Sequence, residues 1–216
     1  MSSPTFSDPL VAARGRYVLP ARLVAAWAGW LAAAVIVGIG LGVHATDPPT
    51  PFAVPHAYRL LVGAELFFIL VAVPGLCGRG RPVGMLQLAL LLVLAAPAVV
   101  VAAWLAECSW RSVAASQCYL LVAAAAMAGY ARLDRAGRSL PWYWLALGLL
   151  AAGAPLLGFL VADLLRAQAG ALFACSPFFV ADRLSQPWAW EWLWVVPAGA
   201  LAAIAAGLWV ASMRRV

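Results

Sequence analysis

Six long, continuously apolar runs dominate this chain of 216 residues. Each run is close to the ~20 residues that an α-helix needs to cross a hydrocarbon core about 30 Å thick. The runs are rich in Ala and Leu and lack a strict polar–apolar alternation, which favours helices over strands. The sequence therefore predicts an all-α integral membrane protein with six transmembrane helices. We expect the spans at about 23–43, 58–77, 83–105, 113–131, 142–163 and 193–211.

The composition indicates the same class of protein. The chain is 66% hydrophobic and 10% charged, and its mean hydropathy is +0.95. A soluble domain carries roughly a quarter charged residues, so this chain could not cover a core of its own with polar side chains. We expect residues 1–22 to form a cytoplasmic amphipathic surface helix and residues 23–216 to form the six-helix transmembrane domain. The first run is too long for the apolar region of a cleaved signal peptide.

The placement of arginine predicts the orientation. The net charge is +6, and all fourteen basic residues are arginines. Positive residues are retained in the cytoplasm, so both termini of this multi-pass membrane protein are expected there. The basic charge therefore indicates orientation, and no nucleic-acid partner is expected. The arginines of the predicted cytoplasmic side are Arg14, Arg16, Arg22, Arg79, Arg81, Arg132, Arg135, Arg138, Arg214 and Arg215.

A hydrophobic outer segment at 164–192 precedes the sixth predicted span. Its stretch "AGALFACSPFFVADRL" contains Phe173 and Phe178 but is too short to cross a membrane. We expect one or two short helices, broken at Ser176 and Pro177, that rest in the outer headgroup region or dip into it.

Tryptophans alternate in "PWAWEWLWVVP", immediately before the last span. Trp accumulates where lipid meets water, so this cluster is interpreted as a row of interfacial anchors against membrane lipids. The alternative is a row of rings that lines a lateral entrance for a ligand. Trp27 and Trp142, near the start of the first and fifth spans, are expected in the matching inner belt. The outer anchors are Trp188, Trp190, Trp192 and Trp194.

Glu65 is the intramembrane polar candidate. It lies about eight residues into the second span, ~10–12 Å below the outer surface at 1.5 Å per residue. A carboxylate at that depth is costly and usually faces a bundle interior, a partner or a wet cavity. Candidate partners are Arg111 and the edge formed by Ser116 and Gln117. Two roles remain open: a fixed interhelical hydrogen bond, or a part in substrate passage or coupling.

The sequence contains no recognisable catalytic set. It lacks a Walker motif, a glycine-rich phosphate loop, a His-Glu-x-x-His motif and a Ser/His/Asp set. His44 and His56 flank a proline-rich loop without a third ligand at metal spacing, so they are interpreted as solvated loop residues. We therefore expect no enzyme activity, no metal and no cofactor in this chain.

Cysteines and small residues suggest further contacts. Cys108 and Cys118 bracket a short outer turn, and a disulfide between them is possible in an oxidising compartment. Cys175 could pair instead, so the connectivity stays open.

Small residues at every fourth position mark faces for close helix packing, within the chain or between chains, with packing inside one bundle as the preferred interpretation. These are Gly199, Ala203 and Gly207 in the last span, with Gly38 and Gly42 in the first. Pro97, Pro155 and Pro197 are expected to bend their helices.

Taken together, these features resemble the permease subunit of type-2 ABC transporters. The similarity consists of a basic surface helix beginning "DPLVAARGR", a proline at the lower end of the second span in "LVAVPGL", and another in "LAAPAVV". A basic inner loop follows the fourth span, and the outer segment contains "SPF". The family's members are bacterial exporters whose permeases work as dimers with cytoplasmic ATPase subunits.

The resemblance implies a transmembrane path in this chain, ATP hydrolysis in a separate ATPase subunit, and a second permease copy or homologue. One feature departs from the family, because only "CGRGRPVG" connects the second and third spans, where a longer coupling helix is usual. Coupling would then use the candidate ATPase contacts Arg79, Arg81, Arg132, Arg135 and Arg138. The alternative is a non-transporting structural subunit of a larger membrane complex, in which these arginines serve orientation and anionic lipid binding.

Overall fold

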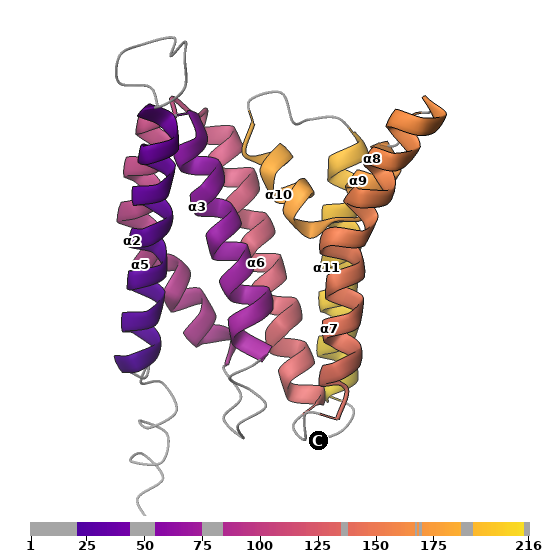
Figure 1. Cartoon of the computed structure of the whole chain (residues 1–216). Coiled ribbons are helices and arrows are strands. Elements are labelled where there is room, and N and C mark those ends of the chain that lie inside the picture. The colour runs from indigo at the N-terminus through magenta and orange to yellow at the C-terminus, as the bar shows by residue number, and fades with distance from the viewer. Residues whose placement is uncertain are drawn as a thin grey trace, which may run out of the picture.

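The computed structural model describes residues 21–43, 55–74, 84–134, 138–166, 168, 170–186 and 192–213. Within these ranges the chain is helical apart from turns, and no strand is present. The prediction of an all-α chain is thereby confirmed (Figure 1). The helices are α2 Ala21–Val43, α3 Pro55–Phe67, η1 Phe68–Ala72, α5 Met85–Leu105, α6 Trp110–Leu133, α7 Leu140–Gly148, η2 Leu149–Gly153, α8 Ala154–Leu165, α9 Gly170–Ala174, α10 Pro177–Leu184 and α11 Trp192–Met213.

Each predicted apolar run coincides with a helix or with two helices joined by a π turn. Three of these helical stretches are long and apolar enough to cross a membrane: α5, α6 and Leu140–Leu165, which comprises α7, η2 and α8. Two shorter apolar stretches lie in α2 and α11. The chain therefore has the helices of a membrane protein, and the crossing by all six remains a prediction.

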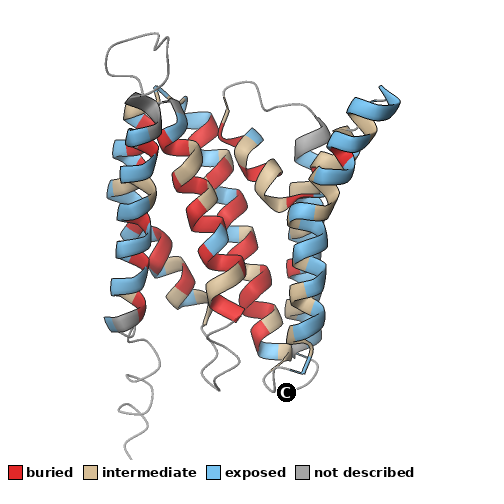
Figure 2. Cartoon of the chain, in the orientation of Figure 1, coloured by how far each residue is buried: buried red, intermediate tan, exposed pale blue. Residues whose placement is uncertain are grey.

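The core lies around α3 and α6. Figure 2 shows buried residues concentrated on these two helices, while α7 and α8 are largely exposed. Leu61, Leu66, Leu88, Leu91 and Leu120 are 0–2% exposed. These side chains pack together between α3, α5 and α6.

Trp27 belongs to this core, so its expected place in an inner aromatic belt is wrong. Its side chain is 2% exposed, and its indole Nε1 donates to the carbonyl of Leu91 on α5 at 2.9 Å. One turn further, Trp30 donates to the carbonyl of Ala64 at 2.9 Å. The indole N–H groups thus tie α2 to its neighbours. Trp142, by contrast, is exposed.

Close contact between long helices occurs at Gly38 and Gly129. A Cβ on Gly38 would lie 3.0 Å from the Ala57 Cα, and one on Gly129 would lie 3.0 Å from the Leu208 Cβ. Gly38 therefore allows α2 to approach α3, as its spacing predicted, while Gly129 is where α6 accepts α11. In each pair, a side chain would push the helices apart.

The small-residue ridge of α11 does not pack inside the chain, contrary to the preferred interpretation. Gly199, Ala203 and Gly207 are exposed, and nothing lies within 4 Å of a Cβ built on either glycine. Instead α11 meets α6 through another face, which includes the buried Ala205 and Trp209, whose Nε1 donates to the Ala125 carbonyl at 3.0 Å. The ridge remains available to lipid or to a second chain.

A π turn precedes Pro74. Proline has no N–H, so the carbonyl of Leu70, four residues earlier, lacks its usual helical donor. The hydroxyl of Tyr143 on α7 donates to this carbonyl at 2.6 Å. A side chain from another helix therefore satisfies the acceptor that proline leaves open.

A second π turn, η2, precedes Pro155, and the same arrangement recurs there. The Ala151 carbonyl loses its donor to Pro155, and the hydroxyl of Ser176 donates to it at 3.4 Å. Ser176 is 1% exposed and begins α10. The expected distortion at Pro155 is present as a π turn, whereas α5 and α11 continue as single helices through Pro97 and Pro197.

The outer segment folds into two short helices, α9 and α10, with Ser176 and Pro177 at the break. This confirms the predicted helices. Val180, Ala181 and Leu184 of α10 are buried against the bundle. α10 packs on α3 and α6, beside which it lies in Figure 1. The segment is thus a fixed part of the fold.

Candidate functional site in a buried polar network

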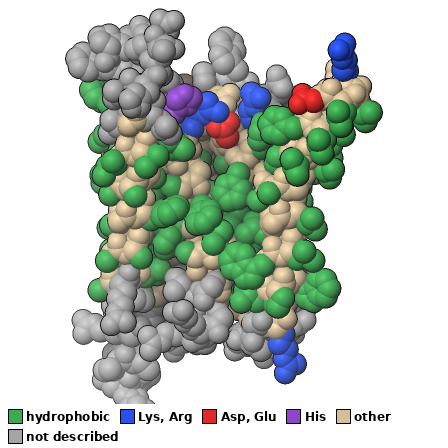
Figure 3. Space-filling model, in the orientation of Figure 1, with side chains coloured by type: hydrophobic (Ala, Val, Ile, Leu, Met, Phe, Trp, Pro, Cys, Tyr) green, Lys and Arg blue, Asp and Glu red, His purple; other side chains and the backbone are tan. Residues whose placement is uncertain are grey.

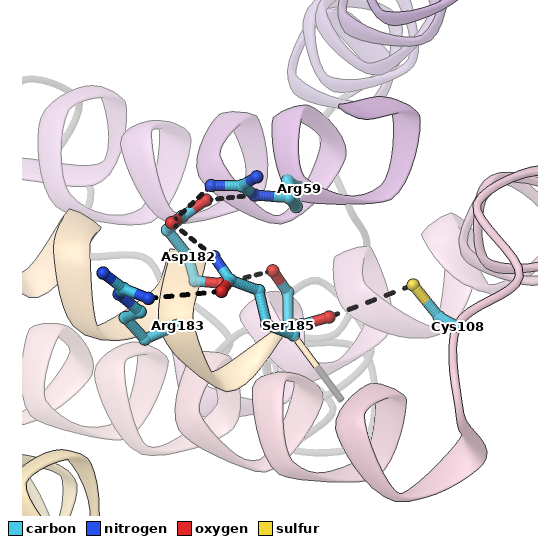
Figure 4. A network of polar contacts seen from close by, with 6 residues as sticks. Arg59, Cys108, Asp182, Arg183 and Ser185 are labelled. Atoms are coloured by element: carbon cyan, nitrogen blue, oxygen red, sulfur yellow. Dashed lines mark hydrogen bonds and ion pairs between the residues drawn. The ribbon is translucent and has the colours of Figure 1, made fainter. Parts of the chain in front are cut away.

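Arg59 and Asp182 form a bidentate ion pair between α3 and α10 (Figure 4). Arg59 Nε donates to Asp182 Oδ1 at 2.6 Å, and a terminal guanidinium nitrogen donates to Oδ2 at 2.7 Å. The two side chains are 36% and 30% exposed, so water screens this pair less than an ion pair on an open surface. Two parallel charge-assisted bonds also define the orientation of α10.

The end of α10 is held by further polar contacts. Gln186 Nε2 donates to Asp182 Oδ2 at 3.1 Å, and the Gln186 carbonyl accepts from the Ser112 hydroxyl on α6 at 3.1 Å. Cys108, in the turn between α5 and α6, donates weakly to the Ser185 carbonyl at 3.9 Å (Figure 4). α10 is therefore attached to α3, to α6 and to the turn that precedes α6.

Tyr58 and Ser116 make a buried hydroxyl pair between α3 and α6. Their oxygens lie 2.6 Å apart, and both residues are fully buried. Ser116 also donates to the Ser112 carbonyl at 2.9 Å. Ser112 lies one turn closer to the helix start, where Ser109 caps α6 by accepting from the Ser112 N–H at 3.2 Å. Hydroxyl groups thus continue from the α5–α6 turn into the bundle.

Glu65 lies deeper on α3 and is completely buried. Its Oε2 accepts from Gln117 Nε2 at 3.0 Å, while Oε1 has no hydrogen-bond partner among the described residues. Of the partners considered from the sequence, the structure brings Gln117 to Glu65. Arg111 is exposed at the start of α6. Oε2 therefore makes an interhelical hydrogen bond, whereas Oε1 is still able to bind another group.

At the opposite end of the bundle, Asp134 organises the α6–α7 turn. Its Oδ2 accepts from the Ser139 hydroxyl at 2.6 Å and from the Ser139 N–H at 2.8 Å, while Oδ1 accepts from the Arg138 N–H at 2.9 Å. These bonds, led by the one from the Ser139 hydroxyl, lower the pKa of the Asp134 carboxyl below its usual value. Asp134 therefore connects the end of α6 with residues 138 and 139 at the start of α7.

The candidate ATPase contacts are described only in part. Arg132 lies 4.0 Å from the centre of the Trp209 ring and thus covers the end of α11, while Arg138 is exposed beside the Asp134 turn. Arg79, Arg81 and Arg135 lie outside the described residues.

The disulfide between Cys108 and Cys118 is not formed, since Cys108, Cys118 and Cys175 are all free thiols. Cys118 is nine residues into α6, ~12 Å along its axis from Trp110, whereas Cys108 precedes that helix. Burial raises the pKa of the Cys108 thiol. Because α6 already begins at Trp110, Cys118 lies within the helix and too far from Cys108 for the two sulfurs to bond.

Several other sequence predictions fall outside the described structure. Residues 1–20, His44, Trp188 and Trp190 are in this group, and Trp192 and Trp194 belong to α11 with side chains that are not described. His56 is exposed at the start of α3. The described residues contain no group of three His, Cys, Asp or Glu that could hold a metal.

Two surface cavities adjoin the network. One, of about 620 Å³, is lined by Trp104, Glu107, Cys108 and Trp110 at the α5–α6 turn. The other, of about 200 Å³, lies between α6, α10 and α11 and includes Cys118 and Leu184 in its walls. Figure 3 shows charged side chains at the two ends of one face and hydrophobic side chains across its middle. The polar network thus lies at the boundary between one of these charged ends and the hydrophobic middle.

Sequence reasoning missed the Arg59–Asp182 pair and the Tyr58–Ser116 pair. Arg59 is absent from the arginines of the predicted cytoplasmic side, and Asp182 lies in the predicted outer segment, so a shared outer side was the only signal available. Tyr58 and Ser116 gave none, because their proximity depends on how α3 and α6 cross. The chain matches no family model, no characterised protein and no solved structure.

Proposed function

We propose that the chain is the permease or permease-like subunit of an ABC-type export complex in the bacterial inner membrane, with both termini in the cytoplasm. ATP is hydrolysed by a separate cytoplasmic subunit. The observation that carries the proposal is the α9–α10 pair. It bears the "SPF" of the family resemblance, and it is folded onto the bundle between the fifth and sixth long helices.

The packed core favours a path between two copies of the chain. Side chains fill the space between α3, α5 and α6, so a solute cannot pass through that part of one chain. α7 and α8 are mostly exposed along their length, and the α11 ridge is open. A dimer could enclose a path along these surfaces, as permeases of the family do.

The coupling surface of this proposal is the α6–α7 turn together with the short connector between η1 and α5. Asp134 bonds Ser139, so a push on this end of α6 would also reach the start of α7. Arg side chains make bidentate contacts to carboxylates, and an acidic groove on the ATPase is the expected complement.

A structural subunit of a larger membrane complex is the second candidate. The specific observation in its favour is Glu65, whose hydrogen bond to Gln117 locks α3 to α6 in a core without a path. Such a subunit would need neither an ATPase nor a long coupling helix, and its arginines would serve orientation and lipid contact.

Charge reversal separates the two candidates. Arg135→Glu with Arg138→Glu should leave insertion intact, because the N-terminal arginines with Arg79 and Arg81 still set the orientation, but should reduce co-purification of the ATPase in mild detergent. Arg111→Glu, an exposed residue at the opposite end, is the matched control and should have no effect. An intact complex with stimulated hydrolysis in the double variant, or no ATPase with the wild type, would favour the structural subunit.

Reporter fusions test the orientation on which the proposal depends. Fusions after Arg81, Arg138 and Val216 should be cytoplasmic, and fusions after Thr50 and Gln186 should be exported. A cytoplasmic reporter at Gln186 would contradict the six-span arrangement.

A further inference from the structure

Glu65 occupies an unusual position for an acidic side chain. It lies ten residues beyond Pro55, ~15 Å along α3 at 1.5 Å per residue, and none of its surface is exposed. Its neighbours on α3, Leu61, Val62 and Leu66, are equally buried. Water therefore does not solvate this carboxyl group.

Among the residues that the structure describes, no cation compensates a negative charge there. Arg59, on the same helix, is six residues away on a different face and bonds Asp182 through two nitrogens. The other arginines on packed helices, Arg111 and Arg132 of α6 and Arg183 of α10, have exposed side chains. α5 has no titratable residue, and α2 has none whose side chain is described.

The hydrogen bonds at Glu65 are too few for an ionised carboxylate. An ionised carboxylate only accepts, whereas a protonated one has one acceptor oxygen and one O–H. Oε2 accepts from the Gln117 amide at 3.0 Å, and Oε1 has no hydrogen-bond partner, donor or acceptor, among the described residues. An ionised carboxylate enclosed by apolar side chains needs a cation or several donors, and only one donor is present.

Polar side chains connect this position with the end of the bundle where α10 lies. Tyr58 and Glu65 are seven residues apart, so they share a face of α3. The Tyr58 hydroxyl lies 2.6 Å from Ser116 Oγ and also interacts with the Gln117 side chain, which itself bonds Glu65. Beyond Ser116, Ser112 reaches the Gln186 carbonyl at the end of α10.

We propose that Glu65 is a proton-binding site inside the helix bundle, with the proton on Oε1, and that this proton exchanges with water that enters from the α10 end past the hydroxyl groups of Tyr58 and Ser116. The ligand is a proton rather than a metal cation, because the described residues contain no group of three His, Cys, Asp or Glu that could hold a metal. The site is independent of the export function proposed above and would serve either candidate.

Infrared spectroscopy of the full chain in lipid nanodiscs tests the protonation. At pH 7 the wild-type protein should show the C=O band of a carboxylic acid, and Glu65→Gln should lose it. Asp163→Asn, which removes an exposed carboxyl group on α8, should retain it. If Glu65→Gln instead loses intensity from the carboxylate band, the side chain is ionised and the proposal is wrong.

A second measurement keeps Glu65 in place, so it tests the proposal even if the Glu65→Gln variant misfolds. The chain has glutamates at 65, 107 and 191, so in Glu107→Gln with Glu191→Gln the single glutamate is Glu65. With ¹³C-carboxyl glutamate incorporated, the carboxylic acid band should shift to lower frequency. An isotope shift confined to the carboxylate band would overturn the proposal.

The rate of deuterium exchange tests the route. After transfer to D₂O, the acid band of Tyr58→Phe should keep its intensity but shift more slowly than in the wild type. Tyr130→Phe is the matched control at the opposite end and should exchange at the wild-type rate. Equal rates in wild type and Tyr58→Phe, or equal slowing in both variants, would exclude Tyr58 from the route.

Discussion

At the scale of single residues, polar groups in this chain are few, and Asp134 is one whose contacts are fully defined. Asp134 accepts three hydrogen bonds from two residues in one turn. Tyr130 adds a fourth from its hydroxyl at 3.3 Å. A carboxylate with this many donors is stabilised in its charged form, which explains why an acidic residue occupies an otherwise basic loop.

Asp134 should give the protein a pH-dependent stability. Its pKa is lowered in the folded state, so its contribution is complete above the unfolded carboxyl pKa and is lost as the pH falls through the lower folded pKa. Asp134→Asn should therefore melt below the wild type at pH 7, and the gap should close in acid. Thermal unfolding in detergent at pH 7 and at about pH 3 measures both. A gap that persists in acid would mean that charge is not the cause.

At the scale of helices, two prolines create open carbonyls, and hydroxyl groups from other segments donate to them. Tyr143 serves the carbonyl opened by Pro74, and Ser176 serves the one opened by Pro155. The proline kinks are thus also attachment points, one for α7 and one for the start of α10. One hydroxyl-bearing residue on the partner segment is enough to satisfy an acceptor that would otherwise be buried without a hydrogen bond.

A double-mutant cycle tests this role for Tyr143. Tyr143→Phe should lower the free energy of unfolding by about 1–3 kcal/mol, because it leaves the Leu70 carbonyl without a donor. In a Pro74→Ala background the N–H of residue 74 can serve that carbonyl, so the same change should cost less. Unfolding in mixed detergent measures all four proteins. Equal costs in both backgrounds would show that the hydroxyl does not compensate for proline.

The ion pair between α3 and α10 should hold the short helix in place. Asp182→Asn should weaken the attachment of α10 to α3 by about 1–2 kcal/mol. The fraction of molecules in which α10 is locally detached then rises ~5–30-fold. Cys108 reports this opening if the other three cysteines are replaced by serine. Its half-buried thiol has a raised pKa, so maleimide labelling should be slow at neutral pH and faster in the variant. Asp163→Asn should label as the wild type does, and equal labelling of all three would contradict the prediction.

At the scale of the whole molecule, two kinds of glycine have opposite surroundings. Gly38 touches the Ala57 backbone, and Gly199 faces open space. Gly38→Leu should therefore destabilise the fold by about 1–3 kcal/mol through overpacking. Gly199→Leu should leave the free energy of unfolding unchanged and affect only association between chains. Unfolding titrations and cross-linking in membranes distinguish these effects, and equal destabilisation by both variants would place the α11 ridge inside the fold.

The amino-acid sequence by itself determined where the helices lie. The length of each apolar run and the prolines between runs are local properties, and they predicted α2, α5, α6 and α11 as well as the break at Ser176. They also identified Glu65 as the exceptional buried acid, because one charge in a continuous apolar run stands out without any knowledge of the fold.

Only the tertiary structure decided which residues meet. Arg59 and Asp182 are 123 positions apart, and nothing local links them. Trp27 looked like an interfacial anchor yet is buried, and the ridge on α11 looked buried yet is exposed. The physical reason is that helices which are apolar on every side carry no amphipathic contrast. Their packing faces are then set by shape and by a few long-range hydrogen bonds, which exist only once the helices have come together.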